Sequence, residues 1–326
     1  MKRSRFFYFI ISVLLLSTSS SLGQNFKSIK KYKLDYLVAN KGAEKLIGIR
    51  SFANDGQQYL LLLNPQTLDS KVDIASNYAI SRTPWTKILL EFKTSPYIKS
   101  LTAAAAKDFQ IQDAGIDNAI PEEQGITLTI DLCPSHKPLD RIIFQSVFDE
   151  FKKIEQPAPL AISVSGKWML KHQDDLNWLK DLVNKKDLDI TWINHSYNHE
   201  VNNLPLAENF LLAPGTDLDT EVLENEKLML KNGLLPSIFF RFPGLVSDKS
   251  IVQKIEAYGL IPIGSDAWLA KGQQANSGSI VLIHGNGNEE LGVKDFLELL
   301  KTKKGEVTSK QWLLFDLRKG LQKAYE

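Results

Sequence analysis

The side chains best suited to acid–base or metal chemistry lie in the second half of the chain, each just after an apolar stretch rich in β-branched residues. Five such stretches are followed by a residue of this kind. If the stretches are parallel strands of a barrel, their carboxyl ends converge on one face, which is where barrel enzymes build active sites. The residues concerned are Asp131, His195, His199, Arg241, Asp266 and His284.

His195 and His199 form an H-x-x-x-H pattern. On one turn of helix, imidazoles at i and i+4 face the same side, so both can reach one metal ion. A divalent metal is therefore the expected cofactor. We expect zinc, with cobalt or nickel as alternatives, because imidazole binds all three. Two surface histidines at this spacing are the alternative interpretation.

Asp131 is the candidate general base, and Arg241 is the cation expected to lower its pKa and fix its orientation. His284 is the candidate general acid, with Asp266 holding its second ring nitrogen. The alternatives are ordinary ones: a loop carboxylate for Asp131 and an ion pair on the barrel rim for Arg241. Cys133 has no neighbouring base in the sequence and is expected to be a buried, inert thiol.

Seven apolar stretches alternate with amphipathic segments of helical period from residue 126 onward. This alternation predicts parallel strands with right-handed crossovers. A small or distorted barrel is favoured over an open doubly wound sheet, because polar residues follow so many of the strands. The predicted strands are 126–130, 160–164, 188–193, 237–240, 260–263, 279–283 and 311–315, and the predicted helices are 139–154, 174–185, 220–232, 248–258 and 293–300.

Residues 24–124 have a different pattern and are expected to form a small N-terminal α+β domain or lid of unknown role, followed by the barrel at 125–326. A hairpin is predicted at 46–63, closed by the Asp55-Gly56 turn. A strand is expected at 87–92, and a helix at 100–109 because alanine favours helix.

Residues 1–23 combine a basic start with an apolar run at 6–16, which is typical of a secretory signal peptide. The run is shorter than the ~20 residues that span a bilayer, so no stable membrane insertion is expected after cleavage. We therefore expect an exported protein, periplasmic or extracellular. With 39 Lys+Arg against 38 Asp+Glu the chain has almost no net charge, so it lacks the excess of positive charge that binds the phosphates of nucleic acids.

Five short motifs stand in order between Gly125 and Asn286: T-I-D-L-C at 129–133, H-S-Y-N-H at 195–199, R-F-P-G at 241–244, D-A-W at 266–268 and L-I-H at 282–284. In this order they resemble the T-F-D-D-G, H-[ST]-x-x-H, R-x-P-Y, D-x-W and L-x-H motifs of the polysaccharide deacetylases. That family is the NodB-homology group, also called carbohydrate esterase family 4. The resemblance implies a distorted (β/α)7-type barrel and metal-dependent removal of acetyl groups from N-acetylglucosamine units of an acetylated polysaccharide.

The resemblance also implies roles by position. Asp131 would be the base tuned by Arg241, and His284 the acid oriented by Asp266. His195 and His199 would bind the metal. Two further residues are assigned to substrate binding: Trp268 beside the acetyl methyl, and Gly244 through its backbone N–H.

Three positions depart from the family pattern. The family's second aspartate, its third protein ligand to the metal, is Leu132 here. The tyrosine of the third motif is Gly244, which is expected to open the pocket, and the glycine of the first motif is Cys133. Leu132 favours a catalytically weak or inactive barrel that binds glycan, whereas the retained acid and base residues favour the deacetylase. An amidase acting on another C–N bond is a third alternative.

Overall fold

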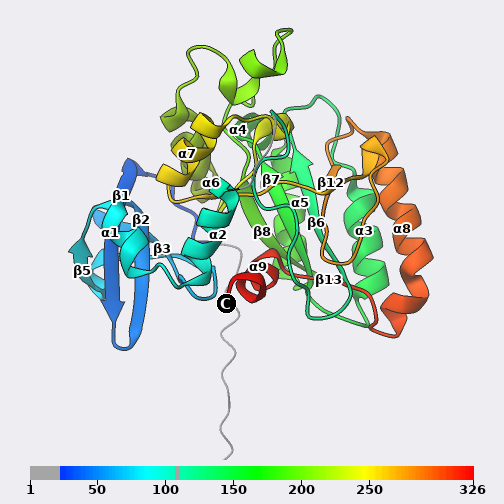
Figure 1. Ribbon diagram of the computed structural model, residues 1–326, viewed down its shortest axis with the longest axis horizontal. Helices are drawn as coiled ribbons and strands as arrows, with labels where there is room; N and C mark the ends of the chain where they lie inside the picture. The colour runs from blue at the N-terminus through cyan, green and yellow to red at the C-terminus, as the bar shows by residue number, and fades with distance from the viewer. Residues whose placement is uncertain (1–22, 107–110) are drawn as a thin grey trace, which may run out of the picture.

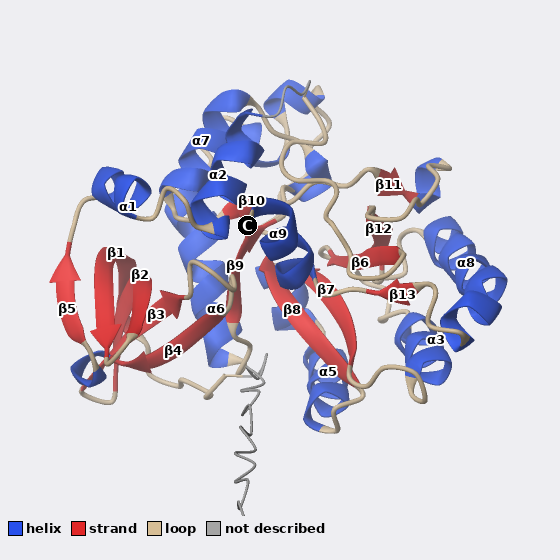
Figure 2. Ribbon diagram, turned by 60° about the horizontal axis from the view of Figure 1, so that its bottom comes forward, coloured by secondary structure: helices blue, strands red, loops and turns tan. Residues whose placement is uncertain are grey.

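The computed structural model describes residues 23–106 and 111–326 and contains two β-sheets (Figures 1 and 2). The predicted signal peptide lies, apart from Gly23, outside the described residues. Among the described helices, none has both the length and the apolar character needed to cross a membrane.

The first sheet is antiparallel, with strand order β4-β3-β2-β1-β5. The hairpin predicted at 46–63 is confirmed, since β2 and β3 pair through the Asp55-Gly56 turn. The elements are β1 Lys30–Lys41, β2 Glu44–Asn54, β3 Gln57–Leu63, β4 Ser70–Ile74, β5 Ala79–Arg82, α1 Trp85–Glu91 and α2 Pro96–Ala106.

The strand predicted at 87–92 is wrong, because this segment belongs to the helix α1. Ile88 and Phe92 are buried while Leu90 is 71% exposed, which is a helical rather than an alternating pattern of burial. Pro84 directly precedes the helix, a position where the missing N–H of proline costs little.

The second sheet is parallel and curls around its own concave face, in the strand order β10-β9-β8-β7-β6-β12-β11, with β13 paired to β6. The predicted (β/α)7-type barrel with a small N-terminal α+β region is confirmed, in the form of a half-open barrel. Its strands are β6 Gly125–Leu132, β7 Ala158–Val164, β8 Leu188–Asn194, β9 Pro236–Phe240, β10 Ile261–Pro262, β11 Ala267–Trp268, β12 Ile280–His284 and β13 Leu313–Leu314.

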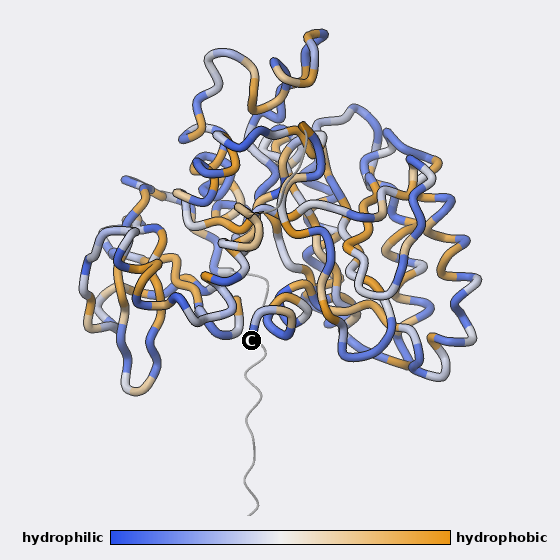
Figure 3. The backbone as a smooth tube through the Cα atoms, in the orientation of Figure 1, coloured by the Kyte–Doolittle hydropathy of each residue, from blue (hydrophilic) through white to orange (hydrophobic). Residues whose placement is uncertain are grey.

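Helices cover the convex face of this sheet. Figure 3 shows the hydrophobic residues gathered along the strands and alternating with hydrophilic ones along α8, as expected for a helix with one buried face. The helices that follow β6 in the chain are α3 Arg141–Phe151, α4 Gly166–Lys171, α5 Gln173–Asn184, α6 Asn225–Lys231, α7 Lys249–Ala257, α8 Glu290–Thr308 and α9 Leu317–Tyr325, of which α9 lies on the opposite, concave side.

The concave face of the parallel sheet is filled in part by α2 and α9, which lie between the two sheets (Figure 2). Tyr97 and Leu101 of α2 share one apolar cluster with Phe239 and Ile261 of the parallel strands and with Leu317 of α9. The N-terminal residues therefore complete the core of the barrel rather than only covering it.

A buried ion pair joins the antiparallel sheet to the helix α6. Arg50 of β2 donates from Nε and Nη2 to the carboxylate of Glu226 on α6, at 2.7 and 2.8 Å, and both side chains have no solvent exposure. Tyr32 also donates to this carboxylate, at 2.9 Å. The pair is fully hydrogen-bonded, which is the condition for a buried charge to be tolerated.

Removing the acid of this pair should therefore be costly. We expect Glu226→Ala to lower the free energy of unfolding by about 3–5 kcal/mol, because Arg50 would remain buried without a counter-charge. Urea unfolding followed by circular dichroism measures the loss. The matched control is Glu44→Ala, which removes an exposed pair with Lys71 and should change stability by less than about 1 kcal/mol. Equal losses in the two variants would contradict this account.

Candidate metal and catalytic site

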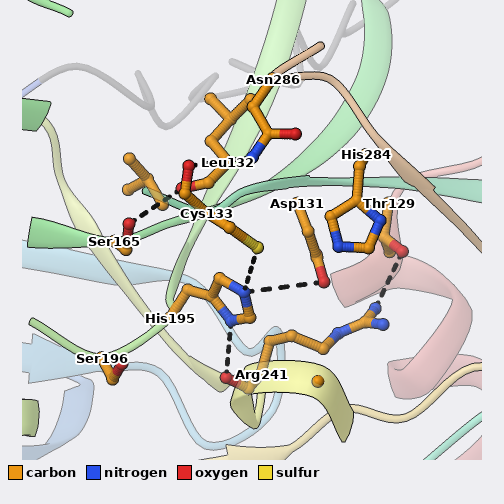
Figure 4. A network of polar contacts seen from close by, with 12 residues as sticks. Thr129, Asp131, Leu132, Cys133, Ser165, His195, Ser196, Arg241, His284 and Asn286 are labelled. Atoms are coloured by element: carbon orange, nitrogen blue, oxygen red, sulfur yellow. Dashed lines mark hydrogen bonds and ion pairs between the residues drawn. The ribbon is translucent and has the colours of Figure 1, made fainter. Parts of the chain in front are cut away.

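The strand β6 presents two different faces (Figure 4). Ile130 and Leu132 point into the apolar cluster under the helices. Thr129, Asp131 and Cys133 point the other way, where they contact Arg241 or His195. Successive side chains of a strand alternate between faces, so residues 129, 131 and 133 share the site.

The loop that carries both histidines is not the helical turn that the sequence predicts. Ser196 and His199 have φ values of 64° and 47°, which lie in the left-handed region and exclude a continuous helix. The side chain of Asn194 accepts a hydrogen bond from the Ser196 N–H at 3.0 Å, and Glu221 accepts from Asn198 at 2.9 and 2.7 Å. These bonds fix the loop, and the two imidazole rings still lie together, with centroids 4.7 Å apart.

His195 is oriented by a backbone carbonyl. Its Nδ1 lies 2.9 Å from the carbonyl oxygen of Arg241, which can only accept, so Nδ1 carries the proton. Its Nε2 faces Cys133 Sγ at 3.4 Å and Asp131 Oδ2 at 3.8 Å. Burial lowers the pKa of His195, but the charge of Asp131, together with Cys133 and the hydrogen bond to the Arg241 carbonyl, more than offsets this, and the pKa is raised overall.

Three metal-ligating atoms meet here, one each from Cys133, His195 and His199. They lie within 4.8 Å of one another, and all three side chains are buried. Neither ring nitrogen of His199 has a hydrogen-bond partner among the described residues, nor has Asp131 Oδ1. Buried polar atoms are costly when left unpaired, and a divalent cation would satisfy one ring nitrogen of His199. The donor set of nitrogen and sulfur fits zinc.

Arg241 is fully buried beside Asp131, as Figure 4 shows, but its direct hydrogen bond goes to the hydroxyl of Thr129, at 2.8 Å. Arg241 therefore acts on Asp131 through its charge, and no direct hydrogen bond joins the two among the described contacts. Burial lowers the pKa of Arg241, and the charge of Asp131 partly opposes this. Arg241 Nε and Nη1 have no partner among the described residues, so they remain available to a ligand.

His284 is oriented by Glu289, which the sequence analysis missed. Its Nδ1 lies 2.7 Å from Glu289 Oε2. Burial lowers the pKa of His284, but the charge of Cys133 and the hydrogen bonds to Cys133 and Glu289, with the charge of Asp131, outweigh burial and raise the pKa well above its usual value. Glu289 directly precedes α8 and follows His284 by five residues. An acidic residue so soon after the last motif is the feature of the sequence that could have indicated a partner for His284.

The prediction that Asp266 orients His284 is wrong. The carboxylate of Asp266 accepts from Ser279 Oγ and from the Ile280 N–H, both at 3.1 Å. Ile280 begins β12 and His284 ends it, so the two are separated by about 13 Å along the strand. Asp266 thus secures the start of β12, at the end away from the site.

The two predicted substrate-binding residues are placed differently. Trp268 packs on Leu245 and Leu282, and its Nε1 donates to both carboxylate oxygens of Glu289 at 3.2 and 3.0 Å. Gly244 does not open the pocket as predicted. It has a φ of 62°, and a Cβ there would come within 2.6 Å of the Phe210 ring, which covers it.

A pocket of about 420 Å³ opens over the metal-ligating atoms. It brings together the side chains of Cys133, His199 and His284, with Glu289 behind the last. The residues that line it are Cys133, Pro134, His199, Val201, His284, Asn288 and Glu289. Of the predicted site residues, His199 and His284 line it, and Asp131, His195 and Arg241 lie beside it, whereas Asp266, Trp268 and Gly244 do not line it.

Comparison with known proteins gives two findings. A family model described as the RP012 protein N-terminal domain matches residues 30–98, which is the antiparallel sheet with α1 and the start of α2. The chain is similar to solved structures of family 4 carbohydrate esterases.

One is a pseudoenzyme of that family from Bacillus anthracis, at 14% identity over 69% of this chain and 81% of that chain, with a TM-score of 0.44. Another is a family 4 carbohydrate esterase from the same organism, at 17% identity over 69% and 91%, with a TM-score of 0.43. A third is PdaA from Bacillus subtilis, at 14% over 75% and 92%, with a TM-score of 0.43. The solved structures thus come from the family that the five motifs predict.

The metal site makes a direct prediction. We expect His195→Ala and His199→Ala to abolish stoichiometric zinc binding, because each removes one ligand of a buried set. Zinc content after dialysis, measured by mass spectrometry, tests this. The matched control is His172→Gln, since the ring of His172 stacks on Trp168 away from the pocket. Full zinc content in either alanine variant would place the metal elsewhere.

Proposed function

We propose that the protein is an exported, metal-dependent deacetylase that hydrolyses acetyl groups from an N-acetylglucosamine-containing polysaccharide. The observation that carries the proposal is the convergence of a buried carboxylate, an oriented imidazole and a set of metal-ligating atoms on one pocket at the carboxyl ends of β6, β8 and β12. The signal peptide predicted at residues 1–23 supports export.

His195 and His199 would hold the metal. When bound, a divalent cation supplies Lewis-acid chemistry, polarising a carbonyl and lowering the pKa of a bound water. His195 is suited to this because its Nδ1–H is fixed on a carbonyl, which leaves Nε2 as the ligating atom.

Asp131 is suited to accept a proton from water. It is 2% exposed, it lies 3.8 Å from His195 Nε2, and its Oδ1 has no partner among the described residues. The buried guanidinium of Arg241, held on Thr129, places positive charge near this carboxylate.

His284 is suited to donate a proton to the departing amine. Its Nδ1 is bonded to Glu289, so Nε2 is the ring nitrogen that can donate to the substrate. The raised pKa of His284 favours the protonated ring, which is the form that a general acid requires. Trp268 completes this arrangement by donating to Glu289.

Acetate release tests the function. We expect the purified protein to release acetate from N-acetylglucosamine oligomers or peptidoglycan, to lose this activity with a chelator and to regain it with zinc or cobalt.

In Asp131→Asn, acetate release should fall by about 10²–10⁴-fold while zinc content is unchanged, because only the base is lost. If the folded, zinc-loaded protein releases no acetate, the proposal fails. If Asp131→Asn loses zinc, Asp131 is a ligand instead.

The pH profile tests the acid. His284 must be protonated to act, and Glu289 helps to raise its pKa. Glu289→Gln removes the negative charge, so the pKa of His284 should fall and the alkaline limb of the activity profile should move to lower pH. Asp266→Asn is the matched control and should leave that limb in place. A shift in the control but not in Glu289→Gln would restore Asp266 as the orienting residue.

A further inference from the structure

We propose that Cys133 binds the metal as a thiolate, together with His195 and His199, and so supplies the third protein ligand that Leu132 does not. The inference rests on the proposed function only in taking this site to hold a metal. It assigns the cysteine a role that its position in the first motif does not suggest.

The spacing of the ligand atoms fits a single ion. With Zn–S near 2.3 Å and Zn–N near 2.0–2.1 Å, sulfur and nitrogen on one tetrahedral zinc lie about 3.6 Å apart. Cys133 Sγ lies 3.4 Å from His195 Nε2, and the atom of His199 lies within 4.8 Å of both. Small rotations of the His199 side chain would close the remaining difference.

Cys133 is held in place through the backbone on both sides (Figure 4). The carbonyl of Leu132 accepts from Ser165 Oγ at 3.0 Å, and the carbonyl of Cys133 accepts from Asn286 Nδ2 at 2.9 Å. Asn286 is itself fully buried. The peptide groups before and after the Cys133 Cα are thus fixed, and the thiol is aimed at the two imidazoles.

The surroundings are not those of an inert buried thiol, which packs among apolar groups. Cys133 instead faces His195, and His199 beside it is 7% exposed with both nitrogens unpartnered among the described residues. A Cys133 thiolate would also give the metal a negatively charged ligand, in place of the carboxylate that is missing at position 132. Asp131 is then free to act as the base. Such a set favours zinc or cobalt over magnesium or calcium.

Cobalt substitution tests the ligand directly. Cys133 is the only cysteine in the chain, so any sulfur-to-cobalt charge-transfer absorption must come from it. We expect the protein to bind one Co²⁺ with a near-ultraviolet band of this kind, releasing the thiol proton. Stoichiometric cobalt without the band would overturn the proposal, and this experiment needs no variant that might fail to fold.

Variants give a second measure. We expect Cys133→Ser to weaken zinc binding by more than about 100-fold, which exceeds the effect of removing a group that only supports a ligand. Cys133→Asp should retain zinc but lose the cobalt band. The control His172→Gln should keep both zinc affinity and the band. Circular dichroism of each variant verifies folding, and unchanged zinc affinity in folded Cys133→Ser would overturn the proposal.

Alkylation separates a ligand from a nucleophile. A metal-bound thiolate should react with iodoacetamide at least tenfold more slowly in the zinc-loaded protein than in the stripped protein. If Cys133 were instead a nucleophile activated by His195, zinc would not protect it, and the proposal would fail.

The deacetylase proposal and the Cys133 ligand proposal can be contradicted independently of each other. A cobalt band in a protein that releases no acetate overturns only the deacetylase, whereas acetate release by Cys133→Ser with normal zinc affinity overturns only the ligand.

Discussion

The alternation of side chains along β6 is the constraint on which the site depends. Every residue of this strand is buried, and it pairs with β7, β12 and β13. Its even-numbered residues from 126 to 132 must be apolar because they pack under the helices, while Thr129, Asp131 and Cys133 face the interior. A shift of one residue in register would exchange the two sets and destroy both core and site.

The polar groups gathered by this strand are expensive to bury. Arg241 and His195 have no solvent exposure and Asp131 has 2%. Several of their polar atoms, and both nitrogens of His199, have no partner among the described residues. Native protein interiors contain few buried polar atoms without a hydrogen-bond partner, and a cluster of them is typical of a site that binds a ligand or a metal. The apolar cluster of α2, α9 and the parallel strands lies away from the pocket and supplies the burial that offsets this cost.

The strands and the polar residues at their ends could be predicted from the sequence, because each strand is an apolar stretch and several of these stretches are followed by a polar residue. The sequence could not predict Glu289, whose approach to His284 depends on how the loop at 285–289 turns into α8. Asp266 shares a short motif with Trp268, but parallel pairing places it beside the first residue of β12 rather than the last. The direction of the Cys133 side chain depends on β6 continuing to Leu132, a boundary that periodicity does not fix.

The same boundary changes the meaning of Leu132. As a position in a motif, a leucine in place of a carboxylate suggests a barrel that has lost its metal. In the fold, the Leu132 side chain is fully buried in an apolar cluster that also contains Ile143 of α3, and a Cβ on Gly285 would lie only 3.3 Å from its Cδ2. A carboxylate there would be buried without a partner, at a cost of several kcal/mol. Leucine is therefore what this strand requires at position 132, and its presence is not evidence against catalysis. The residue that bears on metal binding is the next one, Cys133, whose side chain faces the site.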